Sequence, residues 1–410
     1  MIDITLLRNN QEEYTKKIHK KDPTFDVAKL CSLDQQMRQS LISVEHLRQQ
    51  KNDCAQQAKK GINEELRQKS IDIGKSLKSA EDLLENVQKE FDALYLRCPN
   101  IPSDDVPEGN KESNRVVKTY GQKPTFSFPV KDHLELGQRN EWFDLAAATK
   151  MAASGFVMYK KDGLRLLYAL AMFMLKNNRK HGFEMVLPPY VASEETLTVS
   201  GNFPKFKEDV FTIGADNLYM IPTSEVCLAS LYRDDILKSE QLPIRLTSWT
   251  SCFRREAGNY GKMERGLIRI HQFEKVELVS LCKPQDSYAE LDRMVACAES
   301  ILQQLGLHYQ ISLLAAQDCS FQSAKTFDIE VWLPGQNRYY EVSSASNCTD
   351  FQARRGKIRY REDDNEKTQL VHTLNASSLA LPRLMVALME TCQQSDGSIV
   401  LPEVILKEMI

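Results

Sequence analysis

One stretch limits the possible folds of this chain more than any other, because residues 27–97 contain no proline and only two glycines. Apolar residues recur along this stretch mostly three, four or seven positions apart, which is the spacing of a coiled-coil seam. They are Leu33, Met37, Leu41, Val44 and Leu47, then Leu66, Ile73, Leu77, Leu84, Val87, Phe91 and Leu94. Gly61-Ile62-Asn63 interrupts the seam, and Asn63 can cap the helix that follows. We therefore expect two helices of about 30 residues, folded into an antiparallel hairpin roughly 45 Å long.

Such a hairpin has two plausible uses. Most coiled coils hold proteins together or act as spacers. Residues 48–78, around the expected tip, carry eight Lys or Arg residues against four Asp or Glu residues. A basic tip suits contacts with phosphates, although a solvated helical face would also be charged. The hairpin alone leaves both uses open.

The rest of the chain divides by composition. Residues 101–125 are rich in proline, glycine and polar residues and read as a linker between a domain at 1–100 and a globular domain at 126–410. No run of about 18 apolar residues occurs, so we expect no membrane span. The ten cysteines form no C-x-x-C pair. We therefore expect no zinc framework and no disulfide scaffold, and reduced thiols in the cytosol. The net charge of −3 excludes a uniformly basic nucleic-acid binder but not a local basic face.

The globular part alternates short strand patterns with helical ones. Strands are expected at residues 183–187, 246–256, 267–278, 327–333 and 338–344, and helices at 164–176, 288–305 and 379–390. Strands joined by turns favour an α+β fold, with an antiparallel sheet flanked by helices, over a βαβ array.

Candidate chemistry concentrates in residues 246–278. No Gly-rich phosphate loop of the two common kinds occurs, so any nucleotide chemistry must use arginines and carboxylates. Strand alternation would put Arg254 and Glu256 on one face, and Arg269, Phe273 and Glu277 on one face of the next strand. Such a wall suits phosphates, a base and an amino group. The competing interpretation is a surface sheet with ion pairs.

Three further segments carry similar groups. Thr223-Ser224-Glu225 offers a hydroxyl and a carboxylate, or is merely a strand end or helix cap. Glu341-Val342-Ser343-Ser344 could hold Mg²⁺ or consist of ordinary polar strand residues. Arg383 is expected at the start of a helix, where a lone arginine is usually solvated.

Together these segments resemble the bacterial-type seryl-tRNA synthetases of class II. Cys252-Phe-Arg-Arg-Glu-Ala-Gly258, followed by residues 265–277, resembles motif 2 of that family. Ile221-Pro-Thr-Ser-Glu225 resembles its T-x-E serine motif, and Leu379-Ala-Leu-Pro-Arg383 its motif 3. Further similar segments are residues 182–189 (motif 1), 341–355, 396–403, and the N-terminal residues with the hairpin. The resemblance covers nearly the whole chain.

The resemblance implies a class II catalytic domain at 126–410 and an N-terminal tRNA-binding domain at 1–100 with a coiled-coil arm. It implies attachment of L-serine to tRNA(Ser) through seryl-adenylate, with ATP as substrate, Mg²⁺ and no zinc. It also implies a cytoplasmic homodimer formed through the motif 1 helix and strand, without a membrane. Whether tRNA(Sec) is charged too stays open.

The resemblance also assigns roles to single residues. Arg254 would bind the α-phosphate and the serine carboxylate, and Arg383 the γ-phosphate, as the two catalytic residues. Glu256 would read the adenine amino group, and Phe273 would stack on the ring. The wider ATP site would include Arg255, Arg269, Ile270, Val342 and Ser343, and serine would be held by Thr223, Ser224, Glu225, Glu277 and Ser377. Glu341 and Ser344 would hold Mg²⁺, which requires a bend because strict alternation points them to opposite faces.

The sequence departs from the family pattern at two places. The usual Asn-Gly-Ser-Gly before motif 3 is Asn375-Ala-Ser-Ser378 here, and losing two glycines would stiffen or shift that segment. Residues 199–206 also match loosely. Two rival functions follow: a catalytically impaired paralogue that binds tRNA, and a ligase that charges a carrier protein. Relatives of the second kind lack the long arm.

Overall fold

The structure is a computed structural model, and it describes residues 1–59, 61, 63–256, 266–363 and 365–409. The chain divides into two compact units, which are treated separately below. We call Asp3–Pro99 the arm unit, and Met1–Ile2 together with Asn100–Ile410 the core unit. Among the described residues, no helix is both long enough and apolar enough to cross a membrane.

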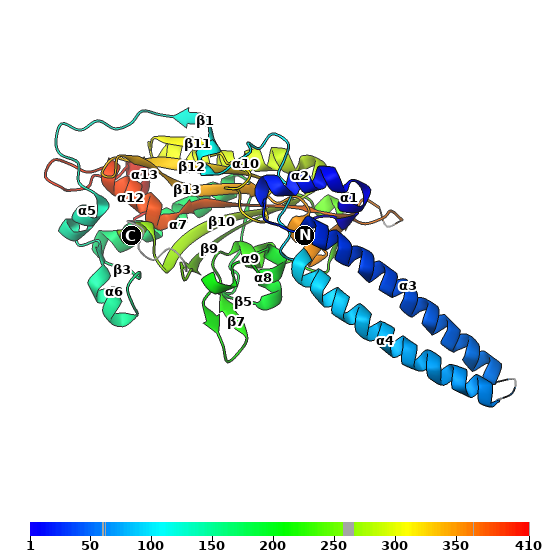
Figure 1. Cartoon of the computed structure of the whole chain (residues 1–410). Coiled ribbons are helices and arrows are strands. Elements are labelled where there is room, and N and C mark those ends of the chain that lie inside the picture. Colours follow the sequence, from blue (N-terminus) through cyan, green and yellow to red (C-terminus); the bar gives the residue numbers. More distant parts are fainter. Residues whose placement is uncertain (60, 62, 257–265, 364, 410) are drawn as a thin grey trace. The chain divides into compact units, whose positions relative to one another are not determined.

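The arm unit contains the predicted coiled-coil hairpin (Figure 1). Its helices are α1 (Ile4–Asn9), α2 (Gln11–Lys21), α3 (Val27–Ala58) and α4 (Glu64–Tyr95). Of the predicted seam, Leu33, Val44, Ile73, Leu77, Val87 and Phe91 are buried, and Cys54 is buried as well, whereas Leu41 is 45% exposed. The Asn63 side chain accepts a hydrogen bond from the Leu66 backbone N–H at 2.7 Å, so the predicted cap of α4 is present. Of the predicted turn and tip, Lys60 and Ile62 lie outside the described residues.

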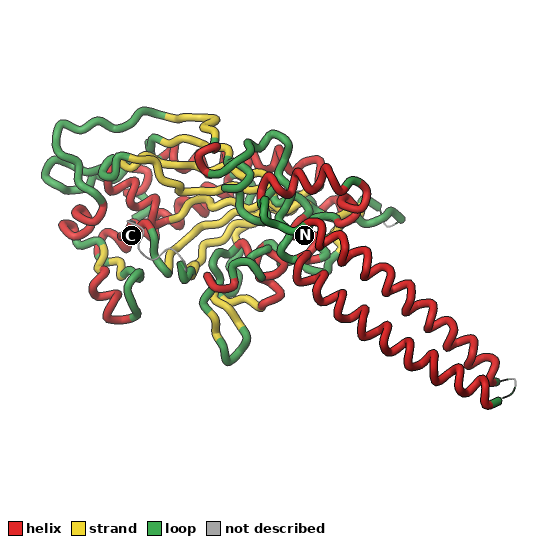
Figure 2. Tube along the Cα trace, viewed as in Figure 1, coloured by secondary structure: helices red, strands yellow, loops and turns green. Residues whose placement is uncertain are grey.

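An antiparallel sheet forms the centre of the core unit (Figure 2). Within the described residues it has eight strands in the order β1-β11-β12-β13-β16-β10-β9-β4, and only β4 and β9 pair in parallel. Their bounds are β1 (Arg115–Tyr120), β4 (Glu184–Met185), β9 (Ile244–Phe253), β10 (Gln272–Cys282), β11 (Tyr309–Leu313), β12 (Lys325–Leu333), β13 (Arg338–Asn347) and β16 (His372–Ala380).

Helices cover this sheet, and the main ones share its hydrophobic core. The main ones are α7 (Lys161–Lys180), α10 (Ser287–Gln304) and α12 (Leu381–Thr391), and shorter ones are α5 (His133–Asn140), α6 (Leu145–Met151), α8 (Glu194–Ser200), α9 (Glu225–Leu228), α11 (Phe351–Gly356) and α13 (Glu403–Leu406). Leu166, Leu170 and Met174 point from α7 into the core, spaced by four residues on one helical face. The predicted α+β class, with an antiparallel sheet flanked by helices, is confirmed.

Smaller elements surround the sheet. Short strands are β2 (Phe143–Asp144), β3 (Met158–Tyr159), β5 (Val191–Ser193), β6 (Thr212–Ile213), β7 (Leu218–Met220), β8 (Ile236–Lys238), β14 (Arg359–Arg361) and β15 (Gln369–Leu370). Single 3₁₀ turns are η1 (Lys111–Ser113), η2 (Lys207–Asp209), η3 (Ser239–Gln241), η4 (Gly266–Ile268) and η5 (Pro284–Asp286).

Residues 101–125 differ from the linker that their composition indicates. Residues 115–120 form β1, which pairs antiparallel with β11 at the edge of the sheet. The Ala316 backbone N–H also donates to the Pro107 carbonyl at 2.8 Å. The prolines and glycines mark bends, but the β-branched Val116 and Val117 between them favour a strand.

The start of α12 also differs from the sequence-based expectation. Strand β16 continues to Ala380, so the helix begins at Leu381 rather than at residue 379. Pro382 lies in the first helical turn, where its missing N–H costs no hydrogen bond. Because the strand passes directly into the helix, Arg383 lies just beyond the end of β16.

Candidate active site

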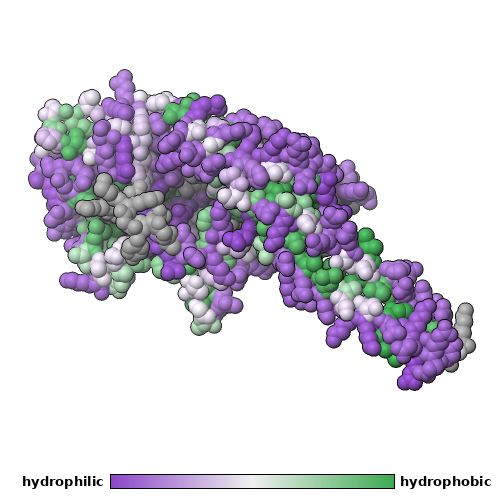
Figure 3. Space-filling view, viewed as in Figure 1, coloured by the Kyte–Doolittle hydropathy of each residue, from purple (hydrophilic) through white to green (hydrophobic). Residues whose placement is uncertain are grey.

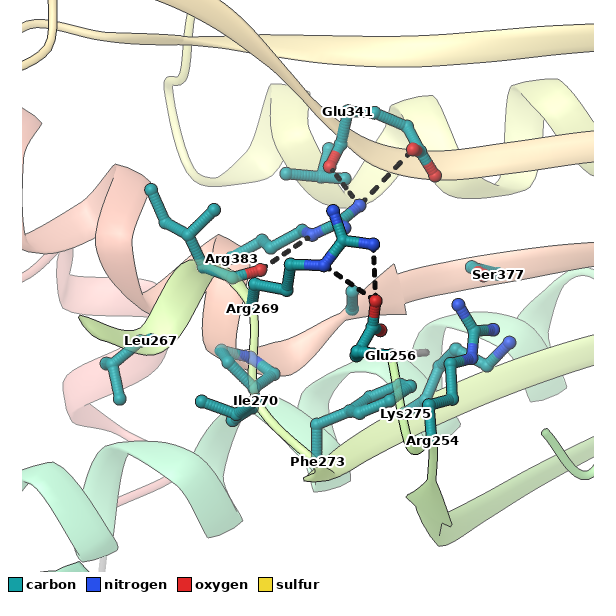
Figure 4. A pocket seen from close by; sticks show the side chains of 14 residues that line it. Arg254, Glu256, Leu267, Arg269, Ile270, Phe273, Lys275, Glu341, Ser377 and Arg383 are labelled. Carbon is teal, nitrogen blue, oxygen red and sulfur yellow. Dashed lines mark hydrogen bonds and ion pairs between the residues drawn. The ribbon is translucent and has the colours of Figure 1, made fainter. Parts of the chain in front are cut away.

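A cavity of about 530 Å³ opens between the sheet and the first turn of α12 (Figure 4). Its walls come from the end of β9, η4 and the residues after it, β10, β13, β16 and α12. The lining residues are Arg254, Glu256, Leu267, Ile268, Arg269, Ile270, Phe273, Lys275, Glu341, Val342, Ser377, Ala380, Pro382 and Arg383. Nine of the residues predicted from the sequence are therefore brought together in one cavity.

Arg254 stands immediately past the end of β9. Its guanidinium carbon lies 5.2 Å from the centroid of the Phe273 ring. Its Nε donates to the Pro222 carbonyl at 3.3 Å, and its backbone N–H donates to the His271 carbonyl at 2.9 Å. These bonds fix the residue although it belongs to no strand. A guanidinium beside an aromatic ring is a suitable wall for a phosphate next to a flat base.

Glu256 and Arg269 form an ion pair across the cavity, with Arg269 Nε 2.6 Å from Glu256 Oε2. The prediction that strand alternation aligns Arg254 with Glu256, and Arg269 with Phe273, is wrong. Strand β9 ends at Phe253, Glu256 has a left-handed φ of 53°, and Arg269 precedes β10. The intervening residues 257–265, which include Ala257, Gly258 and Arg265 of the motif 2 resemblance, lie outside the described residues.

Arg383 lies against Glu341 rather than in solvent. Its Nη1 is 2.9 Å from the Glu341 carbonyl oxygen and 3.3 Å from Glu341 Oε2. Its Nε donates to the Ile268 carbonyl at 3.4 Å, and its guanidinium carbon is 4.9 Å from the Tyr340 ring centroid. The two arginine–glutamate pairs lie side by side in Figure 4. The alternative of a solvated arginine at a helix start therefore does not hold for Arg383.

A β-bulge in β13 supplies the bend that Glu341 and Ser344 require. Across the ladder Glu330 pairs with Glu341 and Asp328 pairs with Ser344, so Val342 is the extra residue. Because Asp328 and Glu330 are two residues apart, their side chains share a face, and so do those of their partners. Val342 and Ser343 are both buried, and Val342 also lines the cavity.

Asp328 is a carboxyl group of this face that sequence reasoning missed. Burial and the neighbouring Glu341 carboxylate raise the pKa of Asp328 well above its ordinary value, while a hydrogen bond with Ser344 opposes the shift. The only available signal was its position two residues before Glu330 on the same strand. Carboxylate and hydroxyl oxygens are the donors that Mg²⁺ prefers, so Glu341 and Ser344 fit that ion by their chemistry. Among the described residues no group of three or more His, Cys, Asp or Glu side chains could hold a metal ion by itself.

A second group of charges lies next to the cavity and is almost completely buried. Thr223 Oγ1 donates to Glu277 Oε2 at 2.9 Å, and Lys275 forms an ion pair with the same carboxylate. Glu277 lies directly opposite Ser377 in the β10–β16 ladder. Lys275 and Ser377 also line the cavity, so the two groups adjoin. Lys275 was not predicted, although its position two residues before Glu277 puts both side chains on one strand face.

Glu225 begins α9 and belongs to this buried group. Its Oε1 accepts hydrogen bonds from Gln352 Nε2 at 2.9 Å and Asn375 Nδ2 at 3.0 Å. Burial and the nearby Glu277 carboxylate raise the pKa of Glu225 to about 7, against the opposing effects of Lys275 and Gln352. A buried carboxylate beside another carboxylate is a good partner for a small cation.

The remaining predicted residues have different environments. Ser224 caps α9 and is buried, and its Oγ has no hydrogen-bond partner among the described residues. Ser343 Oγ donates to the Ser377 carbonyl. Arg255 does not line the cavity: its backbone N–H donates to the Asp209 carbonyl and its Nη1 donates to the Glu208 carbonyl, both in η2. The structure therefore does not bring Arg255 to the cavity.

Comparison with known proteins agrees with these features. Residues 1–102 match the family model for the seryl-tRNA synthetase N-terminal domain, and residues 207–392 match the class II tRNA synthetase core domain (G, H, P, S and T). A serine–tRNA ligase 2 from Clostridium acetobutylicum is 42% identical, over 99% of this chain and 98% of its own length. A serine–tRNA ligase from Acidithiobacillus ferrooxidans is 44% identical, over 98% of this chain and 96% of its own.

Solved structures agree as well. The crystal structure of seryl-tRNA synthetase from Pyrococcus horikoshii complexed with ATP has a TM-score of 0.93 and 33% identity, covering 100% of this chain and 98% of that one. The cytoplasmic serine–tRNA ligase from Naegleria fowleri in complex with AMP has a TM-score of 0.84 and 26% identity, covering 98% and 94%. On sequence, fold and cavity together, the chain belongs to the seryl-tRNA synthetase family.

Proposed function

We propose that this chain attaches L-serine to tRNA(Ser) in two steps. The serine carboxylate attacks the α-phosphate of ATP, which gives seryl-adenylate and releases pyrophosphate. A ribose hydroxyl at the tRNA 3′ end then attacks the seryl carbonyl and releases AMP. One observation carries the proposal: a cavity lined by arginines and an aromatic ring adjoins a buried group of carboxylates.

Catalysis in this proposal consists of positioning and charge stabilisation. Arg254 binds the α-phosphate and the serine carboxylate, so the nucleophile and its target share one guanidinium. Its fixed position beside Phe273 supports this role. Arg383 binds the γ-phosphate, and its hydrogen bonds with Glu341 and Ile268 hold it in advance of binding.

The adenine binds on Phe273, next to Arg254. Phe273 stacks on the ring, and Glu256 accepts a hydrogen bond from the amino group, with Arg269 holding that carboxylate. Ile270, Val342 and Ser343 complete the surroundings. Glu341 and Ser344 would hold Mg²⁺, which supplies positive charge against the phosphates when it is bound. No zinc ion is needed.

Serine binds in the adjoining pocket. Glu225 and Glu277 provide negative charge for its ammonium group, and Thr223 orients Glu277 through their hydrogen bond. Ser377 and Glu277 face one another, and we assign them to the serine hydroxyl. Ser224 lies between Thr223 and Glu225 in the chain and is assigned to the same site.

The glycines that the family pattern leads one to expect are not required here. No residue of Asn375–Ser378 has a positive φ, so alanine and serine adopt this backbone without strain. Asn375 keeps its hydrogen bond to Glu225, and Ala376 is buried in the ladder. The rival function of a catalytically impaired paralogue loses its support, and whether tRNA(Sec) is also charged is left to the assay below.

The domain at 1–100 is proposed to bind tRNA through its hairpin. Seven basic residues of the tip half are described and all are exposed: Arg48, Lys51, Lys59, Arg67, Lys69, Lys75 and Lys78. Hydrophilic side chains predominate at the far end of the hairpin in Figure 3. Exposed lysines along two neighbouring helices suit contacts with the phosphate backbone of a nucleic acid.

A homodimer is proposed through α7 and the chain that follows it. Leu164, Tyr168 and Met172 are exposed at four-residue intervals, on the face opposite the buried one. Met185, Leu187 and Tyr190 are exposed nearby in the sequence, and Leu187 is 73% exposed. Apolar side chains gathered in this way usually mark an interface. We place this dimer in the cytoplasm, where tRNA, ATP and serine meet.

Serine-dependent exchange between ATP and labelled pyrophosphate tests the proposal directly. Exchange should require serine and should fail with alanine or glycine. Charging should be measured in parallel with tRNA(Ser), tRNA(Sec) and an unrelated tRNA. A purified dimer that shows no serine-dependent exchange would overturn the proposal, and exchange without transfer to any tRNA would indicate a carrier-charging ligase.

A further inference from the structure

A buried histidine outside the proposed site contacts α12, the helix that carries Arg383. His133, the first residue of α5, is 3% exposed, and Glu390 on α12 is fully buried. Glu390 Oε1 is 3.1 Å from the His133 backbone nitrogen and 3.3 Å from His133 Nδ1. Its Oε2 accepts a hydrogen bond from the Gly335 N–H at 2.9 Å, in the turn between β12 and β13. Glu390 thus joins three elements.

The other ring nitrogen of His133 reaches the wall of the ATP cavity. The Leu267 backbone N–H donates to His133 Nε2 at 3.3 Å. A backbone N–H can only donate, so Nε2 must be the acceptor and Nδ1 must carry the proton given to Glu390. Both nitrogens are therefore used by one neutral tautomer.

Gly266 makes this close approach possible. It has a left-handed φ of 73°, and a Cβ built on it would lie 2.3 Å from His133 Nε2. Only glycine can be accommodated there without moving the imidazole or η4.

The contacts close a circuit of hydrogen bonds around the cavity wall. Arg383 and Glu390 are seven residues apart on α12, which is two turns and about 10 Å along one face. Glu390 contacts His133, His133 contacts Leu267, and the next carbonyl, that of Ile268, accepts from Arg383. The wall segment η4 is thus tied to α12 twice.

We infer that His133 is a positioning residue for ATP: through the Leu267 N–H it fixes η4, and so sets Arg383 and Arg269 at the cavity. This inference rests on the proposed function. His133 touches neither substrate in this role, and the hydrogen bonds that join Glu390, His133, Leu267, Ile268 and Arg383 involve none of the residues assigned to serine. Loss of the Leu267 bond should therefore affect ATP more than serine.

Two isosteric substitutions separate the two nitrogens. His133→Asn keeps a donor near the Nδ1 position and loses the Nε2 acceptor, whereas His133→Gln can place an acceptor near the Nε2 position. Pyrophosphate exchange should be measured at varied ATP and at varied serine, together with the midpoint of thermal unfolding. We expect His133→Asn to raise the KM for ATP by roughly 3- to 10-fold, the range for one hydrogen bond. The KM for serine should stay within about twofold, and His133→Gln should recover most of the loss.

His372→Asn is the control, because that histidine is half-buried and also bonded through Nδ1, but to Ser287 away from the cavity. Gly266→Ala is a second probe of the same contact and should raise the KM for ATP without adding to the effect of His133→Asn. Unchanged KM for ATP in His133→Asn would overturn the inference. The inference would also be overturned if the KM values for ATP and serine rose equally and the midpoint of thermal unfolding fell. Failure of the wild-type chain to exchange at all would instead overturn the proposed function.

Discussion

Glu277 on β10 lies directly opposite Ser377 on β16, and the next residue of β16, Ser378, has no counterpart in the ladder. A second bulge, at Val342 of β13, turns Glu341 and Ser344 to one face. Bulges re-aim side chains and are common beside active sites. The two irregular ladder positions flank the proposed site, and each brings together a pair of polar residues on which the proposal depends.

The first prediction concerns the choice of amino acid. A site that hydrogen-bonds a hydroxyl rejects an analogue without it, because its own polar groups are left unpaired. Ser377→Ala should raise the KM for serine by roughly 3- to 10-fold, and Glu277→Gln by roughly 10- to 100-fold, since a charged partner forms the stronger bond. The measurement is pyrophosphate exchange at varied serine with saturating ATP.

Glu299→Gln is the control for this series, because Glu299 is equally buried and also pairs with a lysine, Lys118, at 2.7 Å. It should leave the KM for serine unchanged. Wild-type serine affinity in both site variants would remove the assignment of the hydroxyl pocket.

The second prediction concerns the transition state. Arg254→Ala should lower the rate of pyrophosphate exchange at least about 100-fold, the scale for removing one positioned donor to a developing charge. Arg233→Ala removes an arginine that pairs with Glu195 on the surface and should have no effect. Near-normal exchange in Arg254→Ala would mean that the end of β9 is not part of the ATP wall.

Local rules were enough for the parts of this chain whose structure is set by neighbours in sequence. The Asn63 cap, the seam of α3 and α4, and the β12–β13 hairpin follow from residue spacing and turn chemistry alone. The residues of the proposed site were found mainly by resemblance to a family, because alternation gave the wrong faces for Glu256 and Arg269.

What the sequence could not reveal depends on contacts between distant segments. Nothing near Val342 marks it as the bulged residue, because the bulge is set by pairing with β12. His133 and Gln352 resemble ordinary surface residues until the fold buries them next to carboxylates 257 and 127 positions away in the chain. Long-range pairing of this kind leaves no period in the sequence.

The third prediction is a pH dependence carried by Glu225. Its pKa of about 7 lies above the ordinary 4.5, because of burial and the Glu277 carboxylate. The ammonium group of serine needs the ionised form, so the KM for serine should rise as the pH falls below about 7, approaching tenfold per pH unit, and level off above it. Measuring the KM for serine between pH 5.5 and 8 tests this. Glu225→Gln should remove the pH dependence of this KM and should weaken serine binding at every pH.

The same shift has a consequence for stability without serine. Between about pH 4.5 and 7 the folded chain holds a proton on Glu225 that the unfolded chain has released. This group's contribution to the free energy of unfolding is therefore largest at low pH and is lost as the pH rises through about 7. As the pH rises over that range, the free energy of unfolding of the wild type should therefore fall relative to that of Glu225→Gln. A parallel pH profile for the two proteins would show that Glu225 titrates normally.

The last prediction separates the arm from the chemistry. Arg48 on α3 and Glu81 on α4 form an ion pair at 2.7 Å, so the two helices are close together at that level. Removing residues 49–80 and joining the ends with a short Gly/Ser bridge should keep the base of the hairpin, including the Arg8–Asp34 pair. Pyrophosphate exchange should survive, because all residues assigned to contact serine and ATP lie beyond residue 220, whereas charging of tRNA(Ser) should collapse.

A milder variant replaces Lys59, Lys69 and Lys75 with alanine, and each lost phosphate contact should reduce the salt dependence of tRNA binding by about one unit of slope. Replacing Lys16, Lys17 and Lys20 of α2 instead is the matched control for lost charge. If the shortened chain still charges tRNA(Ser) at the normal rate, the hairpin is only a spacer.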